Sequence, residues 1–90
     1  TLFRILRDMG ADPVIHDPWI IEYSGDVMER IKGCDAAIVM VRHQEYLKLN
    51  VKDIKNSLRT PILIDGRCVY NRDEAQTAGL IYVGVGVAEN

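Results

Sequence analysis

The chain has 90 residues, and eleven Lys and Arg against thirteen Asp and Glu give it a formal net charge of −2. A chain of this length forms one small domain, and its 48% hydrophobic and 27% charged residues are typical of a folded protein and exclude intrinsic disorder. The slightly acidic balance argues against a general nucleic-acid-binding protein, which carries an excess of basic residues. The longest apolar run covers only residues 36–41, whereas a membrane-spanning helix needs about 20 apolar residues. We therefore expect neither nucleic acid nor a membrane among its partners.

The first half of the chain contains two helical patterns separated by one extended segment. Apolar residues recur at helical spacing over 1–10, which predicts an amphipathic helix. Residues 13–18 predict a short strand that the final proline closes. After a connector, Ser24 is expected to cap a second helix, which Gly33 ends.

The second half continues the alternation of strands and helices. The run over 35–41 is apolar without alternation, which is typical of a strand buried on both faces of a parallel sheet. Asn50 and Asn71 each stand where the first residue before a helix caps it. The remaining expected elements are a helical turn over 43–47, a helix over 51–58, a strand over 61–66, a helix from 72 to 79 and a strand over 80–86.

Strict alternation of buried strands and helices predicts an α/β fold, a three-layer Rossmann-like parallel sheet with helices on both faces. A helix at the start of the chain would ordinarily follow a strand in such a sheet. We therefore expect residues 1–90 to be an incomplete domain that lacks its first strand. The complete domain is expected to begin roughly ten or more residues upstream.

In an open parallel sheet, ligands bind beyond the carboxyl ends of the strands, an edge that we call the rim. Arg67 is the natural donor for an anion such as a phosphate because its guanidinium forms a planar fork. Each rim residue also has an ordinary structural interpretation: Arg67 pairs only with a nearby acid, the histidines are structural or surface residues, and Asp17 makes an Asx turn. The residues expected at the rim are His16, Asp17, Arg42, His43, Asp65, Arg67, Gly84 and Gly86.

The two cysteines, Cys34 and Cys68, are too few for a disulfide-stapled secreted fold, so a cytoplasmic protein with free thiols is expected. Cys34 precedes its strand and Cys68 follows its own, which places them on the order of 17–20 Å apart at opposite edges of the sheet. A disulfide needs Cα atoms within about 7 Å, and no zinc-type spacing of Cys and His is present. We therefore expect no shared disulfide and no metal site.

Several short motifs together resemble one family. The chain resembles the C-terminal, UDP-binding domain of the nucleotide-sugar 6-dehydrogenases, namely the UDP-glucose, GDP-mannose and UDP-N-acetylmannosamine dehydrogenases, over essentially all 90 residues. The motifs that carry the resemblance are Asp17-Pro18, GCDAAIV at 33–39, HQEY at 43–46, Asp65-Gly66-Arg67 and YVGVG at 82–86.

The resemblance implies an enzyme that oxidises the sugar C6 alcohol to a carboxylate in two NAD-dependent steps, through a thioester on a cysteine of an earlier domain. Neither cysteine of this chain matches that motif, and NAD is bound by a domain outside this chain. A central helical region makes the dimer, so the full-length protein is expected to be a homo-oligomer. The resemblance therefore implies that these 90 residues hold the UDP-sugar, contain no catalytic residue and are inactive alone.

Within this chain, the resemblance assigns substrate binding to Arg67, which matches the family arginine that reaches the UDP-sugar. Further rim contacts are expected from Arg42, His43 and Asp65. The sequence departs from the family pattern at Cys68, where Asn or Arg is more usual, and at Val87, where a basic residue is common.

Two other functions stay open at this point. A non-catalytic flavodoxin-like binding or receiver module would need an acidic cluster, a phosphorylatable Asp and a Lys at the rim. The rim offers Asp17 and Asp65 but no Lys. The second alternative is a small thiol enzyme that uses Cys68, with His43 as its partner.

Overall fold

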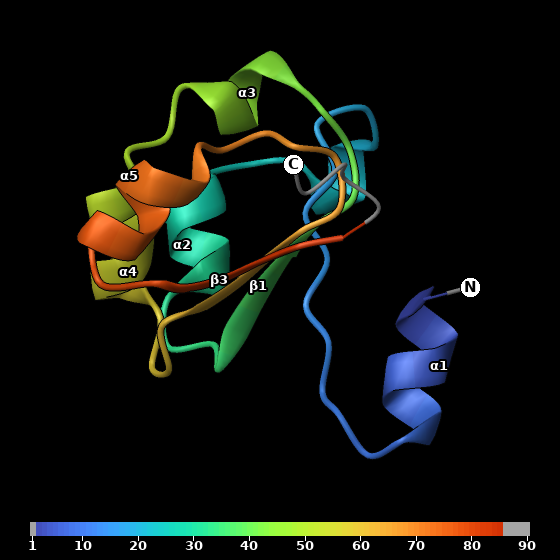
Figure 1. Cartoon of the computed structure of the whole chain (residues 1–90). Helices are drawn as coiled ribbons and strands as arrows, with labels where there is room; N and C mark the ends of the chain where they lie inside the picture. Colours follow the sequence, from blue (N-terminus) through green and yellow to red (C-terminus); the bar gives the residue numbers. More distant parts are fainter. Residues whose placement is uncertain (1, 86–90) are drawn as a thin grey trace.

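The computed structural model describes residues 2–85 and contains one three-stranded parallel sheet (Figure 1). The strands lie in the order β1-β2-β3. In chain order the elements are α1 (Leu2–Asp8), the 3-10 turn η1 (Ile21–Tyr23), α2 (Val27–Ile31), β1 (Ala36–Val39), α3 (Gln44–Leu47), α4 (Val51–Ser57), β2 (Ile62–Asp65), α5 (Arg72–Thr77) and β3 (Ile81–Gly84).

The parallel α/β class expected from the alternating pattern is confirmed. Strand β2 lies at the centre, and its Leu63 is in register with Ala37 of β1 and Tyr82 of β3. Each strand has four residues and is shorter than the span predicted from sequence, because only these four residues are in register with a neighbouring strand. The predicted end of the last strand at residue 86 lies outside the described residues.

The core lies between the sheet and one layer of helices. Figure 1 shows α2, α4 and α5 together on one side of the sheet, where α4 contacts both α2 and α5. Ala75 of α5 is completely buried, so its small side chain lets that helix lie close to β3. The core cluster consists of Ile54, Leu58, Leu63, Val69, Tyr70, Ala75, Leu80 and Tyr82.

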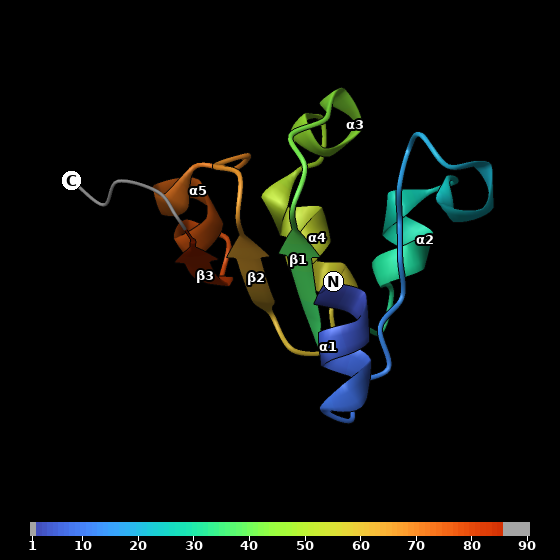
Figure 2. The same cartoon turned by 90° about the vertical axis from the view of Figure 1, so that its right-hand side faces the viewer.

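The opposite face of the sheet is apolar but open. Ile38, Ile64 and Val83 are in register across this face, and Ile38 and Val83 are exposed. Figures 1 and 2 place α1 on this side, apart from the strands, and none of its residues is buried. In residues 2–85, the second helical layer is therefore represented by α1 alone.

The predicted strand over 13–18 is wrong. Residues 11–17 form no regular element, and their polar groups bond to nearby turns instead: the Arg30 guanidinium donates to the Ile15 carbonyl at 2.8 Å, and the Asp17 N–H donates to the Tyr23 carbonyl at 2.9 Å. An extended segment becomes a strand only when a neighbour supplies ladder hydrogen bonds. Within the described part of the chain, no strand pairs with it.

Most predicted helix caps are confirmed. The Asn50 side chain accepts a hydrogen bond from the Lys52 N–H, and the Asn71 side chain accepts one from the Glu74 N–H. The cap predicted at Ser24 is wrong, because its hydroxyl donates to the Ile21 carbonyl within the 3-10 turn. Asp26 caps α2 in its place. None of the helices in residues 2–85 is long and apolar enough to cross a membrane.

The burial pattern predicts which strand residues carry stability. Leu63 is 1% exposed, so the substitution Leu63→Ala should lower the free energy of unfolding by about 2–5 kcal/mol through lost burial and a cavity. Ile81, which is 57% exposed on the neighbouring strand, is the control, and Ile81→Ala should cost about 1 kcal/mol or less. Urea denaturation followed by circular dichroism measures both values. Equal losses for the two variants would contradict this placement of the core.

Candidate ligand-binding rim

The carboxyl ends of β1, β2 and β3 meet at one edge of the molecule, as Figure 2 shows by the common direction of the strand arrows. The rim therefore consists of the β1–α3 loop (40–43), the β2–α5 loop (66–71) and the end of β3. The side chains expected there from sequence fall into a buried group, which shapes the loops, and an exposed group, which faces outward.

Asp65 is the centre of the buried group. Its side chain is 0% exposed. One carboxylate oxygen accepts hydrogen bonds from the N–H groups of Arg67 at 3.2 Å and Val69 at 3.0 Å. The other accepts from the Tyr70 N–H and the Tyr82 hydroxyl, both at 2.8 Å. These four donors fasten the β2–α5 loop and the neighbouring strand β3 to one carboxylate.

The hydrogen bonds decide the charge of Asp65. Burial acts to raise the pKa of this carboxyl, but the hydrogen bonds from the Tyr70, Val69 and Arg67 N–H groups and from the Tyr82 hydroxyl outweigh it, so the pKa lies below its ordinary value. Burial and the adjacent carboxylate raise the pKa of the Tyr82 hydroxyl, which therefore remains a donor.

The expected rim contact from Asp65 is corrected by this geometry. The side chain lies beneath the rim because Asp65 shares the core-facing side of β2 with Leu63, two residues earlier. Its oxygens are already occupied by four donors. A receiver module needs an accessible aspartate to accept a phosphoryl group, so Asp65 does not fit that role.

Arg67 belongs to the exposed group. Its N–H is bonded to Asp65, but its side chain is exposed. Within residues 2–85, its guanidinium has neither a hydrogen-bond nor an ion-pair partner. The structural alternative, in which the Arg67 side chain pairs with Asp65, is therefore not what the structure contains. The guanidinium is exposed at the rim, and none of its donors is used by another group of residues 2–85.

Gly66 lets the β2–α5 loop approach β1 closely. Its N–H donates to the Val39 carbonyl at 2.8 Å. A Cβ atom at this position would lie 3.1 Å from the same carbonyl oxygen, which is tighter than ordinary contact. The Asp-Gly-Arg motif thus combines a buried anchor, a residue without a side chain at the close approach, and an exposed cation.

His43 has a structural role that does not use its whole ring. Its Nδ1 accepts a hydrogen bond from the Glu45 N–H at 3.0 Å and thereby caps α3. The neutral ring therefore carries its proton on Nε2. Trp19, which is 70% exposed, lies edge-to-face on the imidazole with 4.9 Å between ring centroids. The Trp19 N–H donates to the Asp17 carboxylate at 2.9 Å, which confirms the predicted Asx turn.

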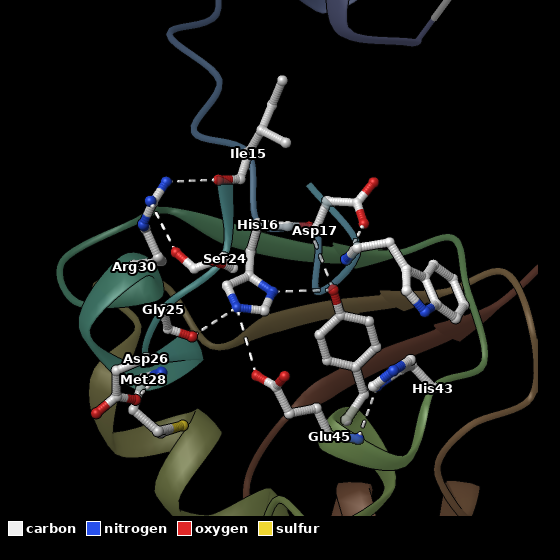
Figure 3. Close-up of polar contacts among 12 residues, drawn as sticks. Ile15, His16, Asp17, Ser24, Gly25, Asp26, Met28, Arg30, His43 and Glu45 are labelled. Carbon is white, nitrogen blue, oxygen red and sulfur yellow. Dashed lines mark hydrogen bonds and ion pairs between the residues drawn. The ribbon is translucent and has the colours of Figure 1, made fainter. Parts of the chain in front are cut away.

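His16 is structural, as Figure 3 shows. Its Nε2 donates to the Gly25 carbonyl at 2.8 Å and lies 3.5 Å from a Glu45 carboxylate oxygen. Its Nδ1 lies 3.0 Å from the Tyr46 hydroxyl, which also donates to the His16 carbonyl at 3.2 Å. Burial, together with Asp17 and Glu45, raises the pKa of Tyr46, so this hydroxyl stays protonated. His16 therefore ties the 11–17 segment to α3.

The cysteines and the surface depressions do not form a second site. Cys34 and Cys68 are both free thiols, and only Cys68 is exposed. No group of three or more His, Cys, Asp or Glu side chains in the described span could hold a metal ion. Two shallow depressions of about 390 and 350 Å³ lie beside α4 and α5, and the segments 47–50 and 69–71 line part of them. Arg67 lines neither depression.

Tyr70 and Tyr82 hold the rim loops in place, a role that was not predicted from the sequence. The Tyr70 hydroxyl donates to the Tyr46 carbonyl at 2.6 Å, which joins the β2–α5 loop to α3. The available signal was the period of two in β2 and β3, which places Asp65 and Tyr82 on the same core-facing side of the sheet, with Tyr82 in register with Leu63 and therefore diagonal to Asp65.

Comparison with known proteins decides the family. The model of the UDP binding domain of the UDP-glucose/GDP-mannose dehydrogenase family matches residues 1–72. The chain belongs to this family. The resemblance inferred from the Asp-Gly-Arg motif and its companions is thereby confirmed, and the match includes the whole Asp65–Arg67 unit.

Individual relatives agree with this assignment. The chain is 29% identical to the UDP-glucose 6-dehydrogenase TuaD of Bacillus subtilis over 94% of its own length and 21% of that protein. It is 32% identical to the UDP-glucose 6-dehydrogenase YwqF of the same organism over 77% of its length. The solved structure of UDP-D-ManNAc dehydrogenase from Pyrococcus horikoshii is similar with a TM-score of 0.75 at 26% identity, covering 92% of this chain and 19% of that one. The chain thus spans about a fifth of the length of these relatives.

The lowered pKa of Asp65 predicts an acid-sensitive rim. A carboxyl whose pKa is depressed in the folded state contributes stability that is fully present above its ordinary value of 3.8 and is lost as the pH falls through the folded-state value. Asp65→Asn should therefore be less stable than wild type at about pH 7 and lose less stability on acidification to about pH 2.5. Urea midpoints across this range measure the effect. The control is Asp35→Asn, because the Asp35 side chain is 76% exposed, and this variant should show the same pH dependence as wild type. Identical pH slopes for all three proteins would contradict the role of Asp65.

Proposed function

We propose that this chain is the UDP-sugar-binding part of an NAD-dependent dehydrogenase that oxidises the sugar C6 alcohol to a carboxylate. Arg67 binds the diphosphate. The observation that carries the proposal is the exposed guanidinium, which has no acceptor within residues 2–85 and stands on a loop fastened by buried Asp65. A planar fork of donors matches two phosphate oxygens at once.

The other rim residues have distinct roles in this proposal. His43 presents its Nε2–H as a further donor, because its Nδ1 is already used to cap α3. Arg42 supports the same loop, since its guanidinium donates to the Cys68 carbonyl at 2.8 Å. Asp65 does not contact the ligand and acts through the loop that it holds.

The oxidation itself belongs to another part of the polypeptide. A pyrophosphate of NAD needs a glycine-rich turn between a strand and a helix. The β1–α3 and β2–α5 turns in residues 2–85 offer a single glycine, Gly66. We therefore place the NAD-binding site outside this chain, and the nucleophilic cysteine as well. Binding energy from the distant diphosphate contributes orientation of the sugar at the reacting centre.

The parent protein is proposed to act in the cytoplasm as a homo-oligomer, with the rest of the dehydrogenase and the UDP-sugar as its partners. The two free thiols support a reducing compartment. The relatives named above, which are UDP-sugar dehydrogenases about five times the length of this chain, support a larger parent enzyme.

The role of Arg67 predicts a loss of UDP binding on its removal. Titration of UDP into the 15N-labelled chain should shift the amide signals of the β2–α5 loop, whereas uridine, which has no phosphate, should shift them far less. Arg67→Met should weaken UDP binding by roughly 10- to 100-fold, because it removes charge-assisted hydrogen bonds. Arg59→Met is the matched control, since that side chain is 77% exposed before β2, at the opposite end of the sheet. Equal affinities of the two variants would refute the assignment.

The division of labour predicts an inactive isolated chain. The purified 90-residue protein should not reduce NAD with UDP-glucose or UDP-N-acetylmannosamine, as followed by absorbance of the reduced cofactor. Supplying the remaining domains as a separate or fused polypeptide should restore turnover. Turnover by the purified chain alone would place catalytic residues within it and contradict the proposal.

A further inference from the structure

One hydrogen bond joins the two loops of the rim. The Arg42 guanidinium, in the β1–α3 loop, donates to the Cys68 carbonyl of the β2–α5 loop at 2.8 Å. Cys68 directly follows Arg67, so the bond ends one residue from the proposed ligand contact. Its acceptor is a backbone group, which means that the bond constrains the path of the chain there.

The peptide unit between Cys68 and Val69 is held from both sides. Its carbonyl accepts from Arg42, and its N–H, which belongs to Val69, donates to the Asp65 carboxylate at 3.0 Å. The N–H of Arg67 is bonded to the same carboxylate. A peptide group bonded at both its C=O and its N–H cannot rotate about its flanking bonds without breaking one of these bonds.

The backbone of Cys68 needs such a restraint. Its φ is +58°, and it is the single non-glycine residue with positive φ in the described part of the chain. Left-handed backbone is unfavourable for an L-residue with a Cβ atom, and Asn or Gly adopts it more readily than Cys. The Asp65 carboxylate holds the N–H of the peptide that follows Cys68, which belongs to Val69, and Arg42 holds the carbonyl of the same peptide.

We propose that Arg42 is a positioning residue that locks Cys68 in its left-handed conformation and thereby aims the Arg67 side chain at the diphosphate. The inference rests on the proposed role of Arg67. It assigns Arg42 a function through the backbone, where the sequence suggested a direct contact with the ligand. Without the tether, Cys68 relaxes toward negative φ, the preceding peptide rotates, and the Arg67 side chain leaves from a different direction.

The first test separates positioning from direct contact by rescue. Arg42→Met should weaken UDP binding about fivefold, the scale set by the cost of left-handed backbone. Adding Cys68→Asn, which favours the left-handed conformation without Arg42, should return the affinity of the double variant to within about twofold of wild type. Cys68→Ala is the matched control, because it also removes the thiol but has no such preference, and it should give no rescue. Unchanged affinity in Arg42→Met, or no rescue by Asn, would overturn the inference.

The second test needs no ligand and so remains informative if UDP does not bind. In Arg42→Met, the Cα chemical shift and the HN–Hα coupling of residue 68 should move away from left-handed values, and Cys68→Asn should restore them. Left-handed values that persist in Arg42→Met would overturn the role of Arg42, whatever UDP does. Absence of UDP binding by wild type together with the expected NMR changes would instead refute the proposed function and leave the loop restraint established.

Discussion

The rim of this domain depends on one buried carboxylate. Removing a charge from water is costly unless hydrogen bonds replace its hydration, and the carboxylate of Asp65 receives four. Three of these donors are backbone groups of the loop that follows β2, and the fourth is the Tyr82 hydroxyl of β3. The same interaction that solvates Asp65 therefore shapes the β2–α5 loop and couples it to the neighbouring strand.

This arrangement leaves the cation beside the buried anion available to a ligand. Asp65 and Arg67 are two residues apart, yet their side chains do not pair, because the acceptor capacity of the carboxylate is used by main-chain N–H groups and by a tyrosine. Because the loop is already fixed, binding of a phosphate has to order only the Arg67 side chain and not the backbone that carries it. Such a rim is suited to hold a ligand.

The fold is unequal on its two sides. Helices α2, α4 and α5 bury one face of the sheet, whereas Ile38 and Val83 remain exposed on the other. The helical period of α1 was recognisable from sequence, and its apolar residues match the open face in character. Its packing was not predictable, since a short amphipathic helix gains most of its stability from the surface that it contacts, and none of its residues is buried here.

Local patterns determined much of this protein. The caps at Asn50 and Asn71 and the Asx turn at Asp17 could be predicted, because these side chains bond to residues next to them in the sequence. The apolar runs predicted a parallel sheet. The family, too, followed from short motifs around Asp65 and Arg67. Tertiary structure alone decided what depends on distant partners. Residues 13–18 have strand-forming composition, but a strand needs a neighbour to pair with. Whether Asp65 or Arg67 faces outward was also decided there, because one of the four donors that satisfy the buried carboxylate, the Tyr82 hydroxyl, lies on another strand.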